Sequence, residues 1–142
     1  MVLAGAVLLG ACSGLESERA VDRIQAPLVN PSWSADIAPV LRETCGSSGA
    51  CHGGAAPQQQ LLLEGPAAAM RAGLVDVPSQ YLSNIALVRP GQPDSSFLLL
   101  AMSDDITVRR GFRYRMPPTT LAMPAAVQQT IRNWIANGAP DN

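Results

Sequence analysis

Three residues in the first half of the chain have types and a spacing suited to covalent cofactor chemistry. Cys45 and Cys51 are separated by five residues, and His52, the single histidine of the sequence, directly follows the second cysteine. Two thiols can add across the two vinyl groups of a haem, while a histidine directly after the second cysteine coordinates the iron from one face. This pattern favours covalent attachment of one haem c, with His52 as the proximal axial ligand.

An iron atom held in this way needs a second ligand on its opposite face, and the sequence has no second histidine. A methionine thioether is the usual alternative in electron-transfer cytochromes, where it raises the reduction potential. Met116 lies in a polar loop and is followed by two prolines, which stiffen the backbone around a weak ligand. We favour Met116 as the distal ligand and keep Met123, directly before Pro124, as the alternative. Met70 and Met102 lie in apolar helical stretches, where methionine is more often core filler.

The same residues allow three other interpretations. A disulfide between Cys45 and Cys51 would close a small loop in a haem-free interaction domain, with His52 as an exposed loop residue. A zinc site would have these three ligands but no obvious fourth. A copper(I) site would combine them with a methionine, which is also a soft ligand. Acid–base catalysis is not indicated, because the chain has no paired histidines, no clear carboxylate dyad and no nucleophile elbow.

A helix is expected to carry the chain into Cys45. Asp36 can cap the start of a helix over residues 36–45, and Pro39 then falls in its first turn, where the missing N–H costs nothing. The apolar residues of this region follow one helical stripe: Trp33, Ile37, Val40 and Leu41. Gly46 and Gly49 then break the helix just before Cys51.

The last helix has the clearest signals in the sequence. Pro124 stands at its start and Gly138 just beyond its end, which is the expected asymmetry. Its apolar stripe again has helical spacing: Val127, Ile131, Trp134 and Ile135. We expect this stripe to pack against the helix at 36–45. Trp33 and Trp134 could contact a porphyrin, but a place in this helix–helix core fits them better.

The segments between these two helices are less regular. Residues 58–64 are expected to be extended or a loop, and residues 66–74 to form a short helix that begins at its proline. Residues 89–94 have strong turn chemistry, and Asp94 can cap a helix that runs to about Met102. Residues 103–120 form a long polar loop, and a loop of this length in a small domain is more often functional than idle.

Composition limits the classes of function. The chain has 142 residues, of which 47% are hydrophobic and 15% charged, so it has enough apolar material for one domain. All ten basic residues are arginines, yet the formal net charge is −1, which does not favour nucleic acid as a partner.

The first residues are expected to be a targeting signal rather than part of the folded domain. Residues 1–11 are apolar or glycine throughout, too few to span a bilayer, and similar to the apolar region of a secretory signal. Leu9 to Cys12 resemble the lipobox of bacterial lipoproteins, which implies that Cys12 becomes the lipid-modified first residue. We therefore expect a tether over 12–32, a domain over 33–142, and a location in the bacterial cell envelope, anchored by lipid and facing the periplasm.

Five segments appear in an order that resembles a class I cytochrome c domain of the planctomycete and myxobacterial type. They are residues 34–41, 51–53, 89–99 with the Arg-Pro-Gly and Pro-Asp-Ser-Ser-Phe runs, 115–118 with Arg-Met-Pro-Pro, and 131–139. The resemblance implies a mostly α fold wrapped around one haem that is bound covalently by Cys45 and Cys51. It also implies His52 and Met116 as axial ligands. The departure from the family is the spacing, because the usual motif has two residues between the cysteines.

The same resemblance implies a function and partners. A domain of this kind is a carrier of single electrons that docks transiently with other redox proteins, rather than an enzyme with a small-molecule substrate. Arg89 and Arg115 are candidates to pair with the haem propionates, although solvated surface positions suit them equally well.

Overall fold

A computed structural model describes residues 18–118 and 122–142. This described part of the chain is small, largely helical and without strands, which confirms the predicted mostly α class. Isolated bridges, Val75 with Val88 and Pro78 with Ala86, are the only β-type pairing among the described residues. The elements in chain order are η1 (Trp33–Ile37), α1 (Ala38–Thr44), η2 (Gln58–Gln60), α2 (Ala67–Ala72), η3 (Pro93–Ser95), α3 (Phe97–Met102) and α4 (Ala125–Ala136).

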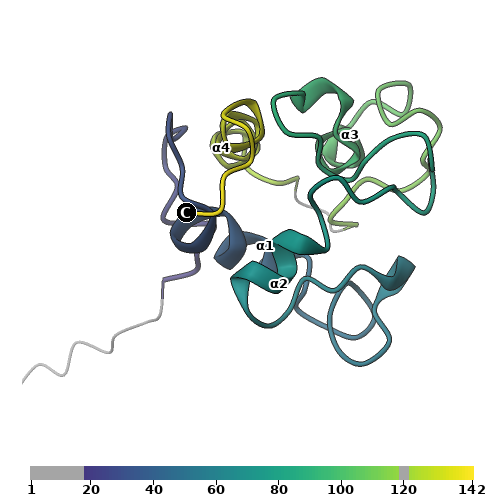
Figure 1. Ribbon diagram of the computed structural model, residues 1–142, viewed down its shortest axis with the longest axis horizontal. Coiled ribbons are helices and arrows are strands. Elements are labelled where there is room, and N and C mark those ends of the chain that lie inside the picture. The colour runs from purple at the N-terminus through teal and green to yellow at the C-terminus, as the bar shows by residue number, and fades with distance from the viewer. Residues whose placement is uncertain (1–17, 119–121) are drawn as a thin grey trace, which may run out of the picture.

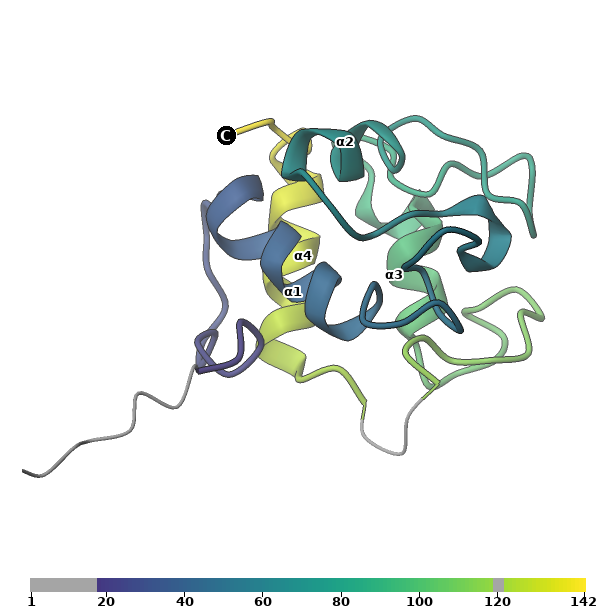
Figure 2. The same cartoon turned by 90° about the horizontal axis from the view of Figure 1, so that it is seen from below.

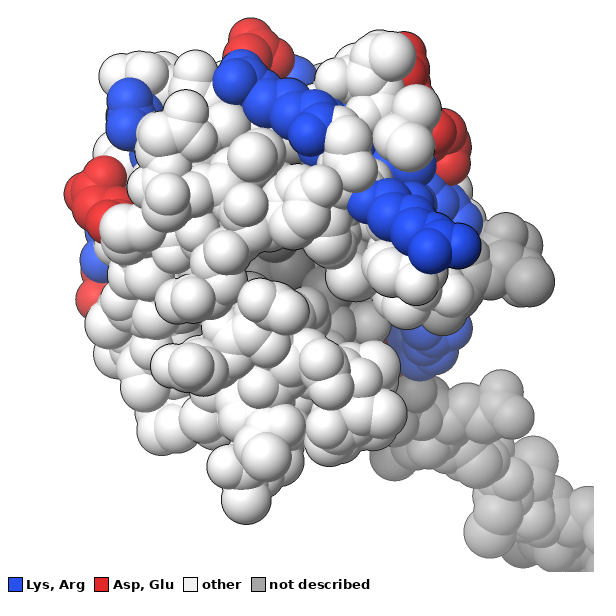
Figure 3. Space-filling model, turned by 90° about the vertical axis from the view of Figure 1, so that its right-hand side faces the viewer, with Lys and Arg blue, Asp and Glu red and all other residues white. Residues whose placement is uncertain are grey.

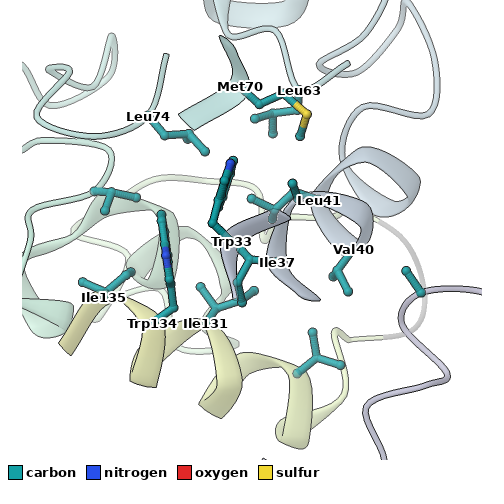
Figure 4. Packing of buried hydrophobic residues seen from close by; sticks show 14 of the residues in the cluster. Trp33, Ile37, Val40, Leu41, Leu63, Met70, Leu74, Ile131, Trp134 and Ile135 are labelled. Atoms are coloured by element: carbon teal, nitrogen blue, oxygen red, sulfur yellow. The ribbon is translucent and has the colours of Figure 1, made fainter. Parts of the chain in front are cut away.

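The helix pair predicted from the two apolar stripes forms the centre of the molecule. The first helical segment, η1 continued by α1, crosses α4 (Figures 1 and 2). The rings of Trp33 and Trp134 stack with their centroids 4.9 Å apart, and both side chains are fully buried. Figure 4 shows the two stripes facing one another across this contact. The predicted core role of both tryptophans is thereby confirmed.

The first helix begins earlier than the sequence predicts. Ser32 is the residue that caps it, because its side chain accepts a hydrogen bond from the backbone N–H of Ala35. Asp36, which we expected as the cap, lies inside the helix and accepts a hydrogen bond from the backbone N–H of Ser32 at 2.7 Å. Two side chains thus satisfy the helix end reciprocally, as in a capping box, and this arrangement moves the start upstream.

Asp94 is not the cap of α3 either. It lies within η3, a separate turn of 3₁₀ helix, and its carboxylate pairs with Arg132 of α4 at 2.7 Å. Ser96 follows this turn in an extended conformation and precedes the first residue of α3. The buried Ser96 hydroxyl donates to the carbonyl of Gln92 at 2.9 Å, so it fixes the turn that leads into the helix.

The packed part of the chain extends upstream of Trp33, where we expected the domain to begin. Ala20, Val21 and Ile24 are buried and belong to the main hydrophobic core. The backbone N–H of Leu28 donates to the hydroxyl of Thr130 in α4 at 3.0 Å. Residues 18–32 are therefore joined to α4 rather than acting only as a tether.

The predicted signal at 1–11 and the lipid site at Cys12 lie outside the described residues. Within the described ranges, no helix is both long enough and apolar enough to cross a membrane.

Candidate functional site

A cavity opens on the side of the molecule away from the helix crossing. The space between its walls, including the open solvent at its mouth, is about 1010 Å³. Residues 44–63 and 97–118 supply most of its lining, with a contribution from residues 79–87. These segments lie in the lower right and upper right of Figure 1. No Arg, Asp or Glu side chain of the described residues lines the cavity, and Figure 3 shows a hollow in a largely uncharged face.

Cys45 is placed by the end of α1. It caps the helix, with its backbone N–H donating to the carbonyl of Leu41 at 2.9 Å. Its Sγ lies 3.4 Å from the hydroxyl of Thr44. Burial raises the pKa of the Cys45 thiol and the nearby Cys51 raises it further, against an opposing contribution from Thr44. The thiol is therefore held in its neutral form, and both cysteines are free in the structure.

The five residues between the cysteines form a compact loop that returns the chain to α1. The backbone N–H of His52 donates to the carbonyl of Cys45 at 2.9 Å, which closes the loop. Inside it, the backbone N–H groups of Cys51 and Gly53 both donate to the carbonyl of Ser48, at 3.0 and 3.1 Å. The unusual spacing is thus absorbed locally, and Cys45, Cys51 and His52 all line the same cavity.

Two glycines make this loop possible through close backbone packing. A Cβ on Gly46 would lie 2.0 Å from the carbonyl oxygen of Leu63, and one on Gly53 would lie 2.2 Å from that of Gly46. Neither distance leaves room for a side chain. Gly46 was predicted only as a helix breaker, and the one sequence signal for this packing role is its place beside the Cys–His pattern.

The His52 ring has a defined tautomer. Its Nδ1 lies 3.1 Å from the backbone carbonyl oxygen of Gln58. A carbonyl can only accept, so Nδ1 is the donor, and in the neutral ring Nε2 then keeps its lone pair. Histidines that bind a metal characteristically donate their other ring N–H to a carbonyl or carboxylate in this way. The geometry therefore prepares Nε2 of His52 as a ligand.

The methionines fall in different places. Met116 lines the cavity, and its backbone N–H donates to the carbonyl of Ala101 at 2.8 Å. Met123, the alternative, is buried in the main core and does not line the cavity. Met70 is also a core residue. Met102 belongs to the core as predicted, but it borders the cavity as well, so it is a second thioether near the site.

Neither arginine singled out for the propionates lines the cavity. Arg115 makes an ion pair with Asp104 at 3.3 Å, and Arg89 is exposed. Both tryptophans are also absent from the lining.

An aromatic cluster on the cavity wall was not predicted from the sequence. The ring of Phe112 lies 4.9 Å from that of Tyr81 and 5.4 Å from that of Phe97, in edge-to-face contacts. All three line the cavity. They come from three separate segments, so no local pattern could have grouped them.

None of the family models, curated proteins or solved structures compared with this chain matches it. Within residues 18–118 and 122–142, no three His, Cys, Asp or Glu side chains are grouped as they would be around a metal ion.

Proposed function

We propose that the protein is a monohaem c-type cytochrome that carries single electrons between redox proteins of the cell envelope, anchored by lipid at Cys12. The observation that carries this proposal is the lining of one cavity: it includes both free cysteines, the histidine that follows them, and Met116. The lone pair on Nε2 of His52 supports the same assignment, because Nδ1 is already used by Gln58.

The residues present fit a haem bound covalently by Cys45 and Cys51. A porphyrin needs an apolar surround, and the lining consists mainly of aliphatic and aromatic side chains without a full charge. His52 and Met116 would be the axial ligands, from the two segments that supply most of the lining. When bound, a haem supplies a one-electron redox couple, while the protein sets its ligation and its dielectric environment.

The ligand set argues for a carrier rather than an enzyme. If His52 and Met116 both held the iron, no open position would remain for a substrate. A thioether favours the reduced iron and so raises the potential relative to a second imidazole. The protein would exchange electrons through brief encounters with its partners, which need only a small interface.

The proposal is tested by producing the full chain in bacteria that carry a cytochrome c maturation system. We expect a Soret band that survives acid–acetone extraction and a mass increase of one haem. Cys45→Ser and Cys51→Ser, each alone, show by mass and by the α-band position whether one or two thioether bonds form. A colourless protein with Cys45 and Cys51 bridged to one another would overturn the proposal and favour a haem-free interaction domain.

The axial ligands have their own signatures. His52→Ala should lose low-spin haem, while Met116→Leu should lower the reduction potential and remove the methionine-to-iron charge-transfer band. Met123→Leu is the matched control, because it changes a core thioether that does not line the cavity. If the band survives in Met116→Leu and disappears in Met123→Leu, the ligand is Met123. If it disappears only in Met102→Leu, the ligand is the second thioether at the cavity.

A further inference from the structure

Two exposed arginines are close in the chain to Phe112, which lines the cavity. The Tyr81 hydroxyl donates to the carbonyl of Gly111 at 3.1 Å, and both Tyr81 and Phe112 line the cavity. Arg110 and Arg113 flank the Gly111–Phe112 pair in the chain, and both are exposed. We refer to Arg110 and Arg113 as the arginine edge.

The positive charge of this edge is not neutralised locally. Among the described residues, the ion pairs involve Arg115 and Arg132, and no carboxylate lies within ion-pair distance of Arg110 or Arg113. The guanidinium of Arg113 instead lies 5.5 Å from the ring centroid of Tyr114, which is itself exposed. Neutral contacts of this kind leave the charge free to act on an approaching molecule.

The backbone holds the edge in a fixed and strained conformation. Arg110 has a φ of 53° and Gly111 a φ of 80°, so two successive residues are left-handed. Arginine adopts this region rarely, and such strain persists only where the surroundings impose it. Buried Arg109 imposes it here, because its guanidinium donates to the carbonyls of Ser103 at 2.6 Å and Phe112 at 2.9 Å.

The described residues that line the cavity have no full charge. Exposed residues that line it include Gln58, Gln59, Gln80, Tyr81 and Pro118. In Figure 3 the surroundings of the hollow are mostly white, with basic side chains above and toward the upper right and some acidic ones next to them. The mouth therefore combines a neutral centre with a positive border on one side.

We propose that this mouth is the docking face for a redox partner whose own surface has an uncharged centre bordered by carboxylates on one side. The carboxylates would meet the arginine edge, and exposed Tyr81 would contact the neutral centre. The inference rests on the proposed function, since it supposes that electrons leave through this mouth. Charges at the rim of such an interface act mainly on the association rate and on orientation.

The sign of the salt dependence provides the test. The whole chain has a net charge of −1, so its overall field should repel an anionic oxidant. We expect the arginine edge to attract hexacyanoferrate(III) instead. This anion takes one electron from the ferrous protein and becomes hexacyanoferrate(II). Its rate constant should fall several-fold between about 10 mM and 1 M salt, over which the screening length shrinks from about 30 Å to about 3 Å.

The variants keep the fold while they remove the charge. Arg110→Asn suits a left-handed position, because asparagine is enriched there, and it is combined with Arg113→Gln. This double variant should lose most of the salt dependence. Arg23→Gln, an exposed arginine that does not line the cavity, is the matched control and should behave as the unchanged protein.

A second measurement does not depend on haem. Hexacyanochromate(III), a paramagnetic anion that does not exchange electrons under these conditions, is titrated into the isotope-labelled haem-free chain. It should broaden the amide signals of residues 109–114 and of Tyr81 in preference to others, and the double variant should lose this effect. Preferential broadening without haem attachment would contradict the proposed function while keeping the anionic docking face.

Two results would overturn the docking face itself. One is a hexacyanoferrate rate that rises with salt, together with broadening spread evenly over the other arginines. The other is protection of residues 109–114 by anionic phospholipid vesicles but not by the soluble anion, which would assign the edge to a membrane surface.

Discussion

The helix-pair core and the cavity half of the molecule are built in different ways. The core consists of η1, α1 and α4, whose apolar stripes interlock around the stacked Trp33 and Trp134. The cavity half consists of residues 44–63 and 97–118, where most of the chain is loop and short helical turn. Side-chain packing holds the first region together, whereas the second combines a smaller hydrophobic cluster around Phe97 with backbone hydrogen bonds and close glycine contacts.

This difference separates stability from chemistry. The candidate ligands Cys51, His52 and Met116 all lie on loops of the cavity half, and Cys45 lies at the point where α1 leaves the core. A loop can take a conformation that a helix cannot, provided that a rigid scaffold supports it. We therefore expect a substitution in the core to destabilise the whole fold. A substitution in the cavity half is expected to disrupt the site while the fold remains.

The largest expected effect is on the core. Trp134→Ala removes a fully buried ring and its stacking contact with Trp33, and we expect it to lower the free energy of unfolding by about 3–5 kcal/mol. Chemical denaturation followed by circular dichroism measures this loss on the haem-free protein. Leu62→Ala, at a side chain that is 45% exposed, is the control and should change little. A loss below about 1 kcal/mol in Trp134→Ala would mean that the stack does not hold the fold.

The next effect should fall on the site and spare the core. Gly46→Ala places a Cβ against the carbonyl of Leu63, and overpacking of this kind typically costs about 1–3 kcal/mol. Because the shift displaces the loop that carries Cys51 and His52, we also expect haem attachment to fall sharply. Gly49→Ala is the matched control in the same loop, since its nearest neighbour would lie 4.0 Å away. Equal haem yields from the two variants would refute the role of Gly46.

The same contrast explains what the sequence could predict. The two long apolar stripes were identified correctly because their helical periodicity is local, and each residue in them is buried. The helix ends were less predictable. Ser32 and Asp36 both form hydrogen bonds at the start of the first helix, so only the structure shows which of them is the cap. The tether over residues 12–32 was predicted from its charges, whereas in its described part three spaced apolar residues, Ala20, Val21 and Ile24, decide the packing.

The candidate site was predictable by residue type but not by architecture. The motif around Cys51 and His52 named the candidate donors, and the prolines after Met116 favoured it over the other methionines. The hydrogen bond from His52 to the Gln58 carbonyl could not be predicted, because any residue type can supply a backbone acceptor. Gly46 was visible only as a glycine, since the group it approaches belongs to Leu63, far along the chain.

The two cysteines should differ in reactivity, which sharpens the view that Cys45 belongs partly to the core. In the reduced, haem-free protein at pH 8, iodoacetamide should modify Cys45 more slowly than Cys51, because burial raises the pKa of the Cys45 thiol above its ordinary 9.0. Mass spectrometry of the digested protein measures both rates. The difference should disappear in denaturant, and equal rates in the folded protein would contradict the placement of Cys45.

The raised pKa of Cys45 also has a consequence for stability. The folded state favours the neutral thiol, so this contribution to stability is fully present below pH 9.0 and is lost as the pH rises through the folded pKa. The Cys45→Ala variant should lack this alkaline loss.

The smallest expected effect lies where the two regions meet. Arg132 of the core helix α4 donates to Asp94 in the turn before α3, and this hydrogen bond, aided by the charge, lowers the pKa of Asp94 below its ordinary 3.8. Arg132→Gln should return the Asp94 pKa toward 3.8, as measured by NMR titration of the carboxyl carbon. The pKa of Asp105, lowered by its hydrogen bonds from Thr107, should not move and is the internal control.

The pH dependence of stability has a definite sign in this pair. A depressed folded pKa contributes stability above pH 3.8, and that contribution is lost as the pH falls through the folded value. Because both side chains are substantially exposed, solvent screening keeps the contribution small, and Arg132→Gln should leave unfolding at neutral pH almost unchanged. A large loss of stability at neutral pH would contradict this. It would mean that the surface pair, rather than the buried contacts behind it, holds the cavity half against the core.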